Sequence, residues 1–154
     1  MNQNNSGFFG PIPPVTKNLL IINLLCYLAQ VVLAGKGFDI VRWGGLHYVG
    51  GDTFYPHQLI TYMFLHADFK HLFFNMFALF MFGRALESMW GQKRFLFYYM
   101  VTGIGAGLIQ LLVWYFTFDL SGAPDYILST LSIIGASGAV FGILVAFGMM
   151  FPNS

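Results

Sequence analysis

Charged side chains are scarce in this sequence, at 8% of its 154 residues, whereas hydrophobic residues make up 57%. A soluble domain usually carries about 25% charged residues. The composition therefore excludes that class and predicts a polytopic membrane protein. Seven Lys and Arg residues face six Asp and Glu residues, for a net charge of +1. Such a small excess lacks the basic surface that nucleic acids require, and we expect no nucleic-acid partner.

Cysteine is also nearly absent, and because Cys26 is the only one, no intrachain disulfide can form. No Lys or Arg precedes Lys17, so the chain lacks the basic start of a secretory signal peptide. We interpret the first apolar run as an uncleaved membrane span that follows a flexible N-terminal tail over residues 1–14. Residues 15–154 then form one membrane domain, which we expect to be incomplete at its C-terminus.

Apolar runs predict four transmembrane helices in an all-α helical bundle, because about 20 apolar residues suffice to cross a bilayer. The expected spans are residues 15–34, 71–90, 95–118 and a fourth within 127–151. Only a tight turn separates the second span from the third, so these two should be antiparallel neighbours. The long connection between the first two spans is rich in aromatic side chains, which favours a position at the membrane interface.

Basic residues orient such a bundle, because Lys and Arg gather on the cytoplasmic side. Four of them fall on one side of the predicted bundle and three on the other. The first group is Lys17, Arg84, Lys93 and Arg94, and the second is Lys36, Arg42 and Lys70. We therefore expect a multi-pass protein of a bacterial inner membrane with its N-terminus in the cytoplasm.

The tetrapeptide Gly135-Ala136-Ser137-Gly138 lies in the fourth apolar run, where residues 127–151 carry no charge. If a helix begins near Gly135, the backbone before it is irregular, and Ser137 lies in a first turn whose N–H groups lack intrahelical partners. Such donors can stabilise an oxyanion, while the two glycines permit unusual backbone angles and close approach. Alternatively, the glycines are small-residue packing contacts, and Ser137 forms a hydrogen bond between helices.

His71 and Asn75 open the second span four residues apart, so they share one helical face. Both side chains donate hydrogen bonds, which suits an oxyanion hole. Alternatively, both residues are structural: Asn75 forms a hydrogen bond with a neighbouring helix, and His71 caps the interface. We expect His66 to lie nearer the water and to order the loop. The two histidines have neither the spacing nor the glutamate of a zinc motif, so we expect no metal.

Together, the two motifs on separate spans resemble those of rhomboid intramembrane serine proteases, and the stretch from Gly83 to Glu87 is also similar to that family. The resemblance implies a six-helix bundle, of which this chain carries about four helices. It implies that Ser137 is the nucleophile and that His71 and Asn75 assist the oxyanion, alongside the Ser137 N–H. His66, with the glycines flanking the serine, would support the site.

The chain departs from the family pattern in two places. Many members carry Trp-Arg where His57-Gln58 stands here, and the family's base is a histidine of the sixth helix, whereas no histidine follows His71. Because serine needs a base to become a strong nucleophile, we expect the 154 residues alone to be inactive. The complete protein would cleave transmembrane segments of membrane proteins in the lipid bilayer through a Ser-His dyad, without a cofactor. Two alternatives stay open: a non-catalytic rhomboid-like protein that binds transmembrane clients, and a small channel or transporter.

Overall fold

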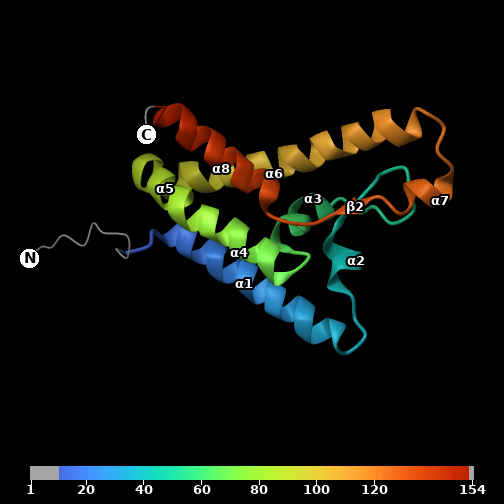
Figure 1. The fold of residues 1–154 in the computed structure, drawn as a ribbon, viewed down its shortest axis with the longest axis horizontal. Coiled ribbons are helices and arrows are strands. Elements are labelled where there is room, and N and C mark those ends of the chain that lie inside the picture. Colours follow the sequence, from blue (N-terminus) through green and yellow to red (C-terminus); the bar gives the residue numbers. More distant parts are fainter. Residues whose placement is uncertain (1–10, 153–154) are drawn as a thin grey trace, which may run out of the picture.

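The computed structural model describes residues 11–152, which form a bundle of helices (Figure 1). Its long helices are α1 (Pro14–Ala34), the continuous helix α4 (Phe69–Ala78), η2 (Leu79–Gly83) and α5 (Arg84–Trp90), and α6 (Gln92–Trp114) with η3 (Tyr115–Asp119). A shorter helix, α8, covers Ser137–Met150. Between them lie α2 (Ile40–Gly44), β1 (Leu46–His47), α3 (Gln58–Thr61), η1 (Tyr62–Phe64), α7 (Asp125–Leu128) and β2 (Ser132–Ile133).

Within residues 11–152, three helices are long and apolar enough to cross a membrane: α1, the continuous helix from α4 to α5, and α6 with η3. The outer face of α1 exposes large apolar side chains such as Leu25, at 58%, and Leu28, at 52%. A surface of this kind is stable in lipid and costly in water. The chain is therefore a multi-pass membrane protein, as its composition predicts.

The fourth apolar segment differs from the other three. Helix α8 has 14 residues, or roughly 21 Å of length, which falls short of the ~30 Å hydrocarbon core. Two residues of extended strand, β2, lie just before it. The expected helix start near Gly135 is thus confirmed. The backbone before it, expected to be irregular, contains the end of α7 and the strand β2, and the segment is not a full span.

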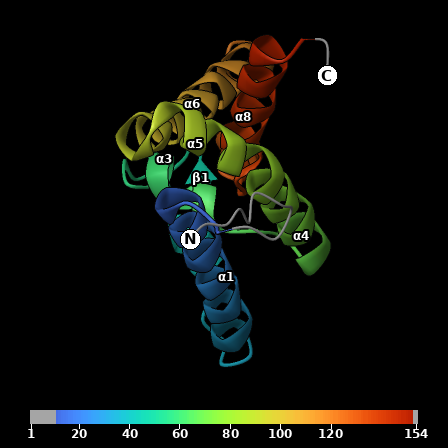
Figure 2. The same ribbon diagram turned by 90° about the vertical axis from the view of Figure 1, so that its left-hand side faces the viewer.

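Figure 1 shows that the start of α1, the turn between α5 and α6 and the end of α8 all lie at one end of the bundle. Helices α4 and α8 therefore run in the same direction, toward that end. Figure 1 places α4 between α8 and α1, and Figure 2, seen from that end, shows α8 beside α6. Of the predicted tail, residues 1–10 lie outside the described residues, and α1 begins at Pro14.

Local chemistry fixes where the long helices begin. Pro14 opens α1, where its missing N–H costs no hydrogen bond. Buried Glu87 accepts bonds from the N–H groups of Val15, at 2.8 Å, and Thr16, at 2.7 Å. At the start of α4, Asp68 accepts from the N–H of His71 at 2.8 Å. These carboxylates satisfy donors that a helix start leaves open.

The long connection after α1 is ordered by a short sheet that the all-α expectation does not include. Strand β1 pairs antiparallel with β2, with Leu46 opposite Ile133. Gln58 is fully buried beneath it: its Oε1 accepts from the N–H of His47 at 3.2 Å, and its Nε2 donates to the carbonyl of Thr53 at 3.0 Å. Gln58 thus holds together the loop next to the strand that leads to Ser137.

Candidate active site

Ser137 is the first residue of α8, and its side chain is exposed. Gly135 has a φ of 125°, a conformation that favours glycine. The N–H of Gly135 donates to the carbonyl of Tyr62 at 2.8 Å, which ties the turn before α8 to η1. Ser137 therefore stands where the first N–H groups of a helix have no intrahelical acceptor.

The imidazole of His71 lies against Gly135. A Cβ added at Gly135 would lie 2.7 Å from Cε1 and 3.3 Å from Nε2 of His71, so a side chain there would collide with the ring. His71 and Ser137 line the same cavity, which has a volume of about 290 Å³. Its remaining walls are Tyr62, Ala106, Gln110, Ile133, Ile134 and Gly138. The structure thus brings the serine of one motif and the second histidine of the other to a shared space.

Asn75 lies one turn beyond His71 on α4 and is 8% exposed. Its Nδ2 is buried and has no hydrogen-bond partner among the described residues, and the same holds for Nδ1 of His71. Buried polar groups are nearly always bonded, so a buried amide donor without a partner is unusual. Asn75 does not line the cavity itself; it lies on the same helix as His71, which does.

His66 lies deeper than expected. Its side chain is 0% exposed, so the expectation that His66 lies nearer the water than His71 is wrong. The backbone N–H of Ala136 donates to His66 Nε2 at 3.4 Å, and the ring centroids of His66 and His71 are 5.2 Å apart. Burial, with a smaller effect of His71, lowers the pKa of His66 to about 4. The ring is therefore neutral at pH 7 and supports the residue before Ser137.

A glutamine from α1 holds His66 in place. Gln30 Oε1 accepts from the His66 N–H at 2.9 Å, and Gln30 Nε2 donates to the His66 carbonyl at 2.8 Å. Both backbone groups of a buried loop histidine are thus satisfied by one side chain of α1. Gln30, His66 and Ala136 form a hydrogen-bonded path that leads to the start of α8.

Gly138 lets α8 approach α6 closely. A Cβ at Gly138 would lie 2.5 Å from Cβ of Ala106, and one turn further a Cβ at Gly142 would lie 2.9 Å from Cβ of Thr102. Both of the motif's glycines therefore have steric reasons to lack a side chain. Gly135 makes room for the His71 ring, and Gly138 makes room for the neighbouring helix. The small-residue packing alternative is correct for Gly138, and it coexists with the site.

The sequence alone does not predict a role in the site for three residues near Ser137. Tyr62 and Gln110 line the cavity, and Gln30 holds His66. A polar amide inside an apolar span is a signal in itself, and both glutamines carry it, but the sequence alone does not show which atoms they meet. Among residues 11–152, no group of three or more His, Cys, Asp or Glu side chains is placed to hold a metal ion.

Comparison with known proteins shows which family the chain belongs to. Residues 54–154 match the family model of the rhomboid domain. The chain is 32% identical over 143 residues to the rhomboid protease AarA of Providencia stuartii, an alignment that covers 86% of the chain and 49% of that relative. It is 33% identical over 125 residues to the chloroplast rhomboid-like protein 11 of Arabidopsis thaliana, covering 81% of the chain and 38% of the relative.

A third relative, mitochondrial rhomboid protein 1 of Saccharomyces cerevisiae, is 38% identical over 101 residues, which covers 63% of the chain and 26% of that protein. The chain thus spans about half the length, or less, of the curated relatives it matches. The matched region contains both motifs, from His66 to Gly138, and most of the described bundle. With the helical membrane bundle and the paired motifs, these matches show that the chain belongs to the rhomboid family.

Proposed function

We propose that the complete protein is an intramembrane serine endopeptidase that hydrolyses peptide bonds in transmembrane segments of other membrane proteins. The observation that carries this proposal is that Ser137, at the start of α8, opens onto the cavity that His71 also lines. A hydroxyl at a helix start, beside an imidazole, is a position from which a nucleophile can attack a carbonyl. The family membership supports the same reaction class.

In the proposed reaction, Ser137 Oγ attacks the carbonyl carbon of the scissile bond, and the carbonyl oxygen becomes an oxyanion. The N–H of Ser137 and the side chains of His71 and Asn75 donate hydrogen bonds to it. Donors arranged in advance, away from bulk water, stabilise such charge strongly. The Nδ2 of Asn75, which has no hydrogen-bond partner among the described residues, supports this role.

The attack requires a base that takes the proton of the Ser137 hydroxyl. The described histidines other than His71 each have a ring nitrogen in contact with a backbone group. Nε2 of His66 accepts the Ala136 N–H, while Nε2 of His47 and of His57 contact backbone carbonyls. We assign the base to a histidine outside these 154 residues, which forms a dyad with Ser137. That histidine passes the proton to the leaving amine, and water then hydrolyses the serine ester and restores the hydroxyl. The 154-residue chain alone should therefore show no turnover.

The proposed substrates follow from the resemblance to the family: transmembrane segments whose helices unwind locally and carry a small residue before the cut. The proposed location is a bacterial inner membrane with the N-terminus in the cytoplasm. The distribution of basic residues supports this orientation, because the basic turn between α5 and α6 lies at the same end as the start of α1 (Figure 1).

The test is cleavage of a model transmembrane substrate by the protein produced from its whole coding sequence, reconstituted in liposomes. Ser137→Ala should abolish cleavage. Ser132→Ala, at an exposed serine of β2 five residues earlier, is the matched control and should cleave normally. Cleavage that survives Ser137→Ala would contradict the proposal. Substrate binding without any cleavage by the unaltered protein would favour the client-binding alternative.

A further inference from the structure

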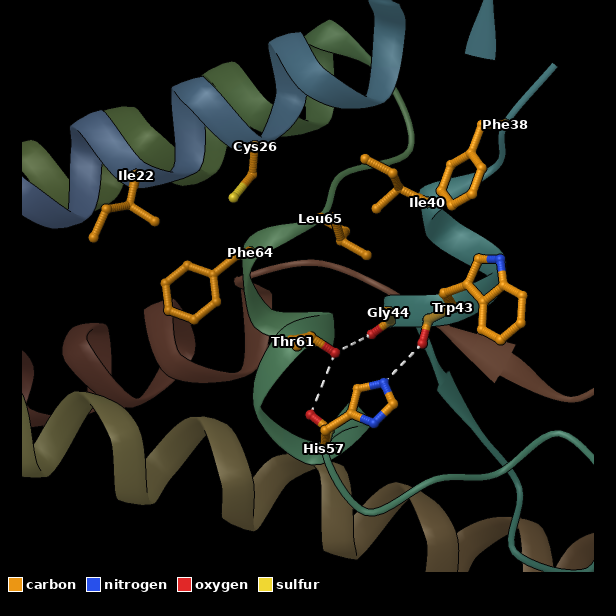
Figure 3. Close-up of a pocket in the computed structure, with 10 residues that line it drawn as sticks. All are labelled: Ile22, Cys26, Phe38, Ile40, Trp43, Gly44, His57, Thr61, Phe64 and Leu65. Carbon is orange, nitrogen blue, oxygen red and sulfur yellow. Dashed lines mark hydrogen bonds between the residues drawn. The ribbon is translucent and has the colours of Figure 1, made fainter. Parts of the chain in front are cut away.

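An apolar groove lies between α1 and the connection that follows it, away from the cavity at Ser137 (Figure 3). It has a volume of about 400 Å³. Ile22 and Cys26 form one wall, Phe38 and Trp43 stand at one end, and Phe64 lies at the other (Figure 3). Ile22, Phe38 and Trp43 are between 43% and 56% exposed, so the groove opens on the surface that lipid covers.

Two residues of α1, Ile22 and Cys26, line the groove, and Ile22 lies about one leaflet below the end of that helix. Ile22, at its deep end, lies twelve residues before Ala34, the end of α1, which corresponds to roughly 18 Å along the helix axis. Half of the ~30 Å hydrocarbon core has a similar depth. A chain that enters beside Trp43 and ends at Ile22 would therefore stay in one leaflet, as an acyl chain does.

A second cavity of about 160 Å³, with two charged side chains in its lining, adjoins the groove, and Trp43 lines both. Arg42, Asp52, Thr53 and Tyr55 complete its lining. Arg42 and Asp52 are both exposed and form no ion pair with each other in the described part of the chain. Two opposite charges therefore face one small space, next to an aromatic ring of the kind that settles at the membrane interface.

We propose that these two cavities form one binding site for a zwitterionic phospholipid whose headgroup ends in a primary ammonium. One acyl chain fills the groove along α1. The phosphate binds the Arg42 guanidinium, whose planar array of donors suits phosphate oxygens, and the ammonium binds the Asp52 carboxylate. An anionic phospholipid offers the phosphate but no cation for Asp52, and a diffusing peptide segment would leave the charge pair unmatched.

The site also joins α1 to the loop that supports Ser137. Thr61 donates to the carbonyl of Gly44 at 2.6 Å, and His57 Nε2 contacts the carbonyl of Trp43 at 3.0 Å (Figure 3). The next residue after Thr61, Tyr62, accepts the N–H of Gly135. A lipid in the groove would brace this loop from the outside, so removing the lipid should lower the melting temperature of the protein.

The test is native mass spectrometry of the delipidated protein, produced from its whole coding sequence, after exchange into nanodiscs that contain equal amounts of phosphatidylethanolamine and phosphatidylglycerol. One retained phospholipid per chain is expected, with phosphatidylethanolamine favoured about tenfold, the effect of one unmatched charge of about 1.4 kcal/mol. Cys26→Trp fills the groove and should abolish retention. Leu25→Trp, on the exposed face of the same helix, is the matched control and should retain the lipid. Asp52→Asn should reduce the preference between the two lipids to parity.

A second measurement needs no substitution: Cys26 is the only cysteine among these 154 residues, and peptide mapping reads its alkylation separately from that of any other thiol. Alkylation of its thiol by a maleimide in the delipidated chain should slow several-fold when phosphatidylethanolamine is added, and less with phosphatidylglycerol. Equal alkylation rates with and without lipid would overturn the proposal. So would retention that survives Cys26→Trp, a preference for phosphatidylglycerol, or an adduct with the mass of a second chain or a peptide.

Discussion

Replacing Gly135 by alanine should damage the candidate active site through two independent effects. The φ of 125° is rarely adopted by residues with a side chain, and such strain costs on the order of 1–3 kcal/mol. In addition, the new Cβ would lie 2.7 Å from Cε1 of His71. The ring would have to retreat by about 0.7 Å to regain an ordinary van der Waals contact, and that retreat carries it away from its place beside Ser137.

The assay pairs thermal unfolding in detergent with the rate at which a fluorophosphonate labels the complete protein. We expect a lower melting temperature and labelling slowed by about 10- to 100-fold, because a misplacement of about 1 Å can cost about 10²-fold. Gly148→Ala, in the helix α8 that follows Gly135, is the control: no atom lies within 4 Å of its added Cβ, and a helical alanine gains about 0.5–1 kcal/mol over glycine. Unchanged stability and labelling in Gly135→Ala would refute the reasoning.

Three further outcomes follow from the contacts. Glu87→Gln weakens the charge-assisted bonds that the carboxylate accepts from two N–H groups at the start of α1 and from the Thr16 hydroxyl, so unfolding should become easier by about 2–3 kcal/mol; an unaltered unfolding midpoint would contradict this. Asn75→Ala removes one oxyanion donor and should lower kcat by about 10²- to 10³-fold while the melting temperature stays close to that of the parent; normal turnover would remove Asn75 from the site. The pKa of His66 is lowered from 6.5 to about 4, so between these pH values His66 binds a proton in the unfolded chain and not in the folded chain. The free energy of unfolding should therefore fall as the pH drops from 6.5 toward 4. His66→Gln should flatten that part of the stability–pH profile, and a profile unchanged by the substitution would argue against a buried neutral ring.

The spans and the start of α8 could be predicted because their signals are local. A long, mostly apolar run marks each membrane segment, and the glycines that flank Ser137 indicate unusual backbone angles or close packing, which a regular exposed helix would not require. The pairing of His71 with Ser137 also follows, since both segments descend from the same side of the bundle. The turn at Gly91, with a φ of 89°, is readable from the short gap between two spans.

The supports of the site could not be predicted, because each depends on contacts between distant parts of the chain. Gln30 lies 36 residues from the His66 backbone that it bonds, and the Ala136 N–H lies 70 residues from His66 Nε2. No local pattern reveals such partners, and a histidine in a loop is expected to face water. The same reason applies to the pairing of β1 with β2, in which Leu46 meets Ile133 across the bundle.

The central claim is that Ser137 is a nucleophile prepared by the groups around it. Its most direct test is labelling of the protein, produced from its whole coding sequence, with a fluorophosphonate, followed by peptide mapping of the modified residue by mass spectrometry. The account predicts a single adduct on Ser137 and no labelling of Ser137→Ala, with Ser132→Ala labelled at the normal rate. An adduct on another residue, or labelling that persists in a folded Ser137→Ala protein, would contradict it.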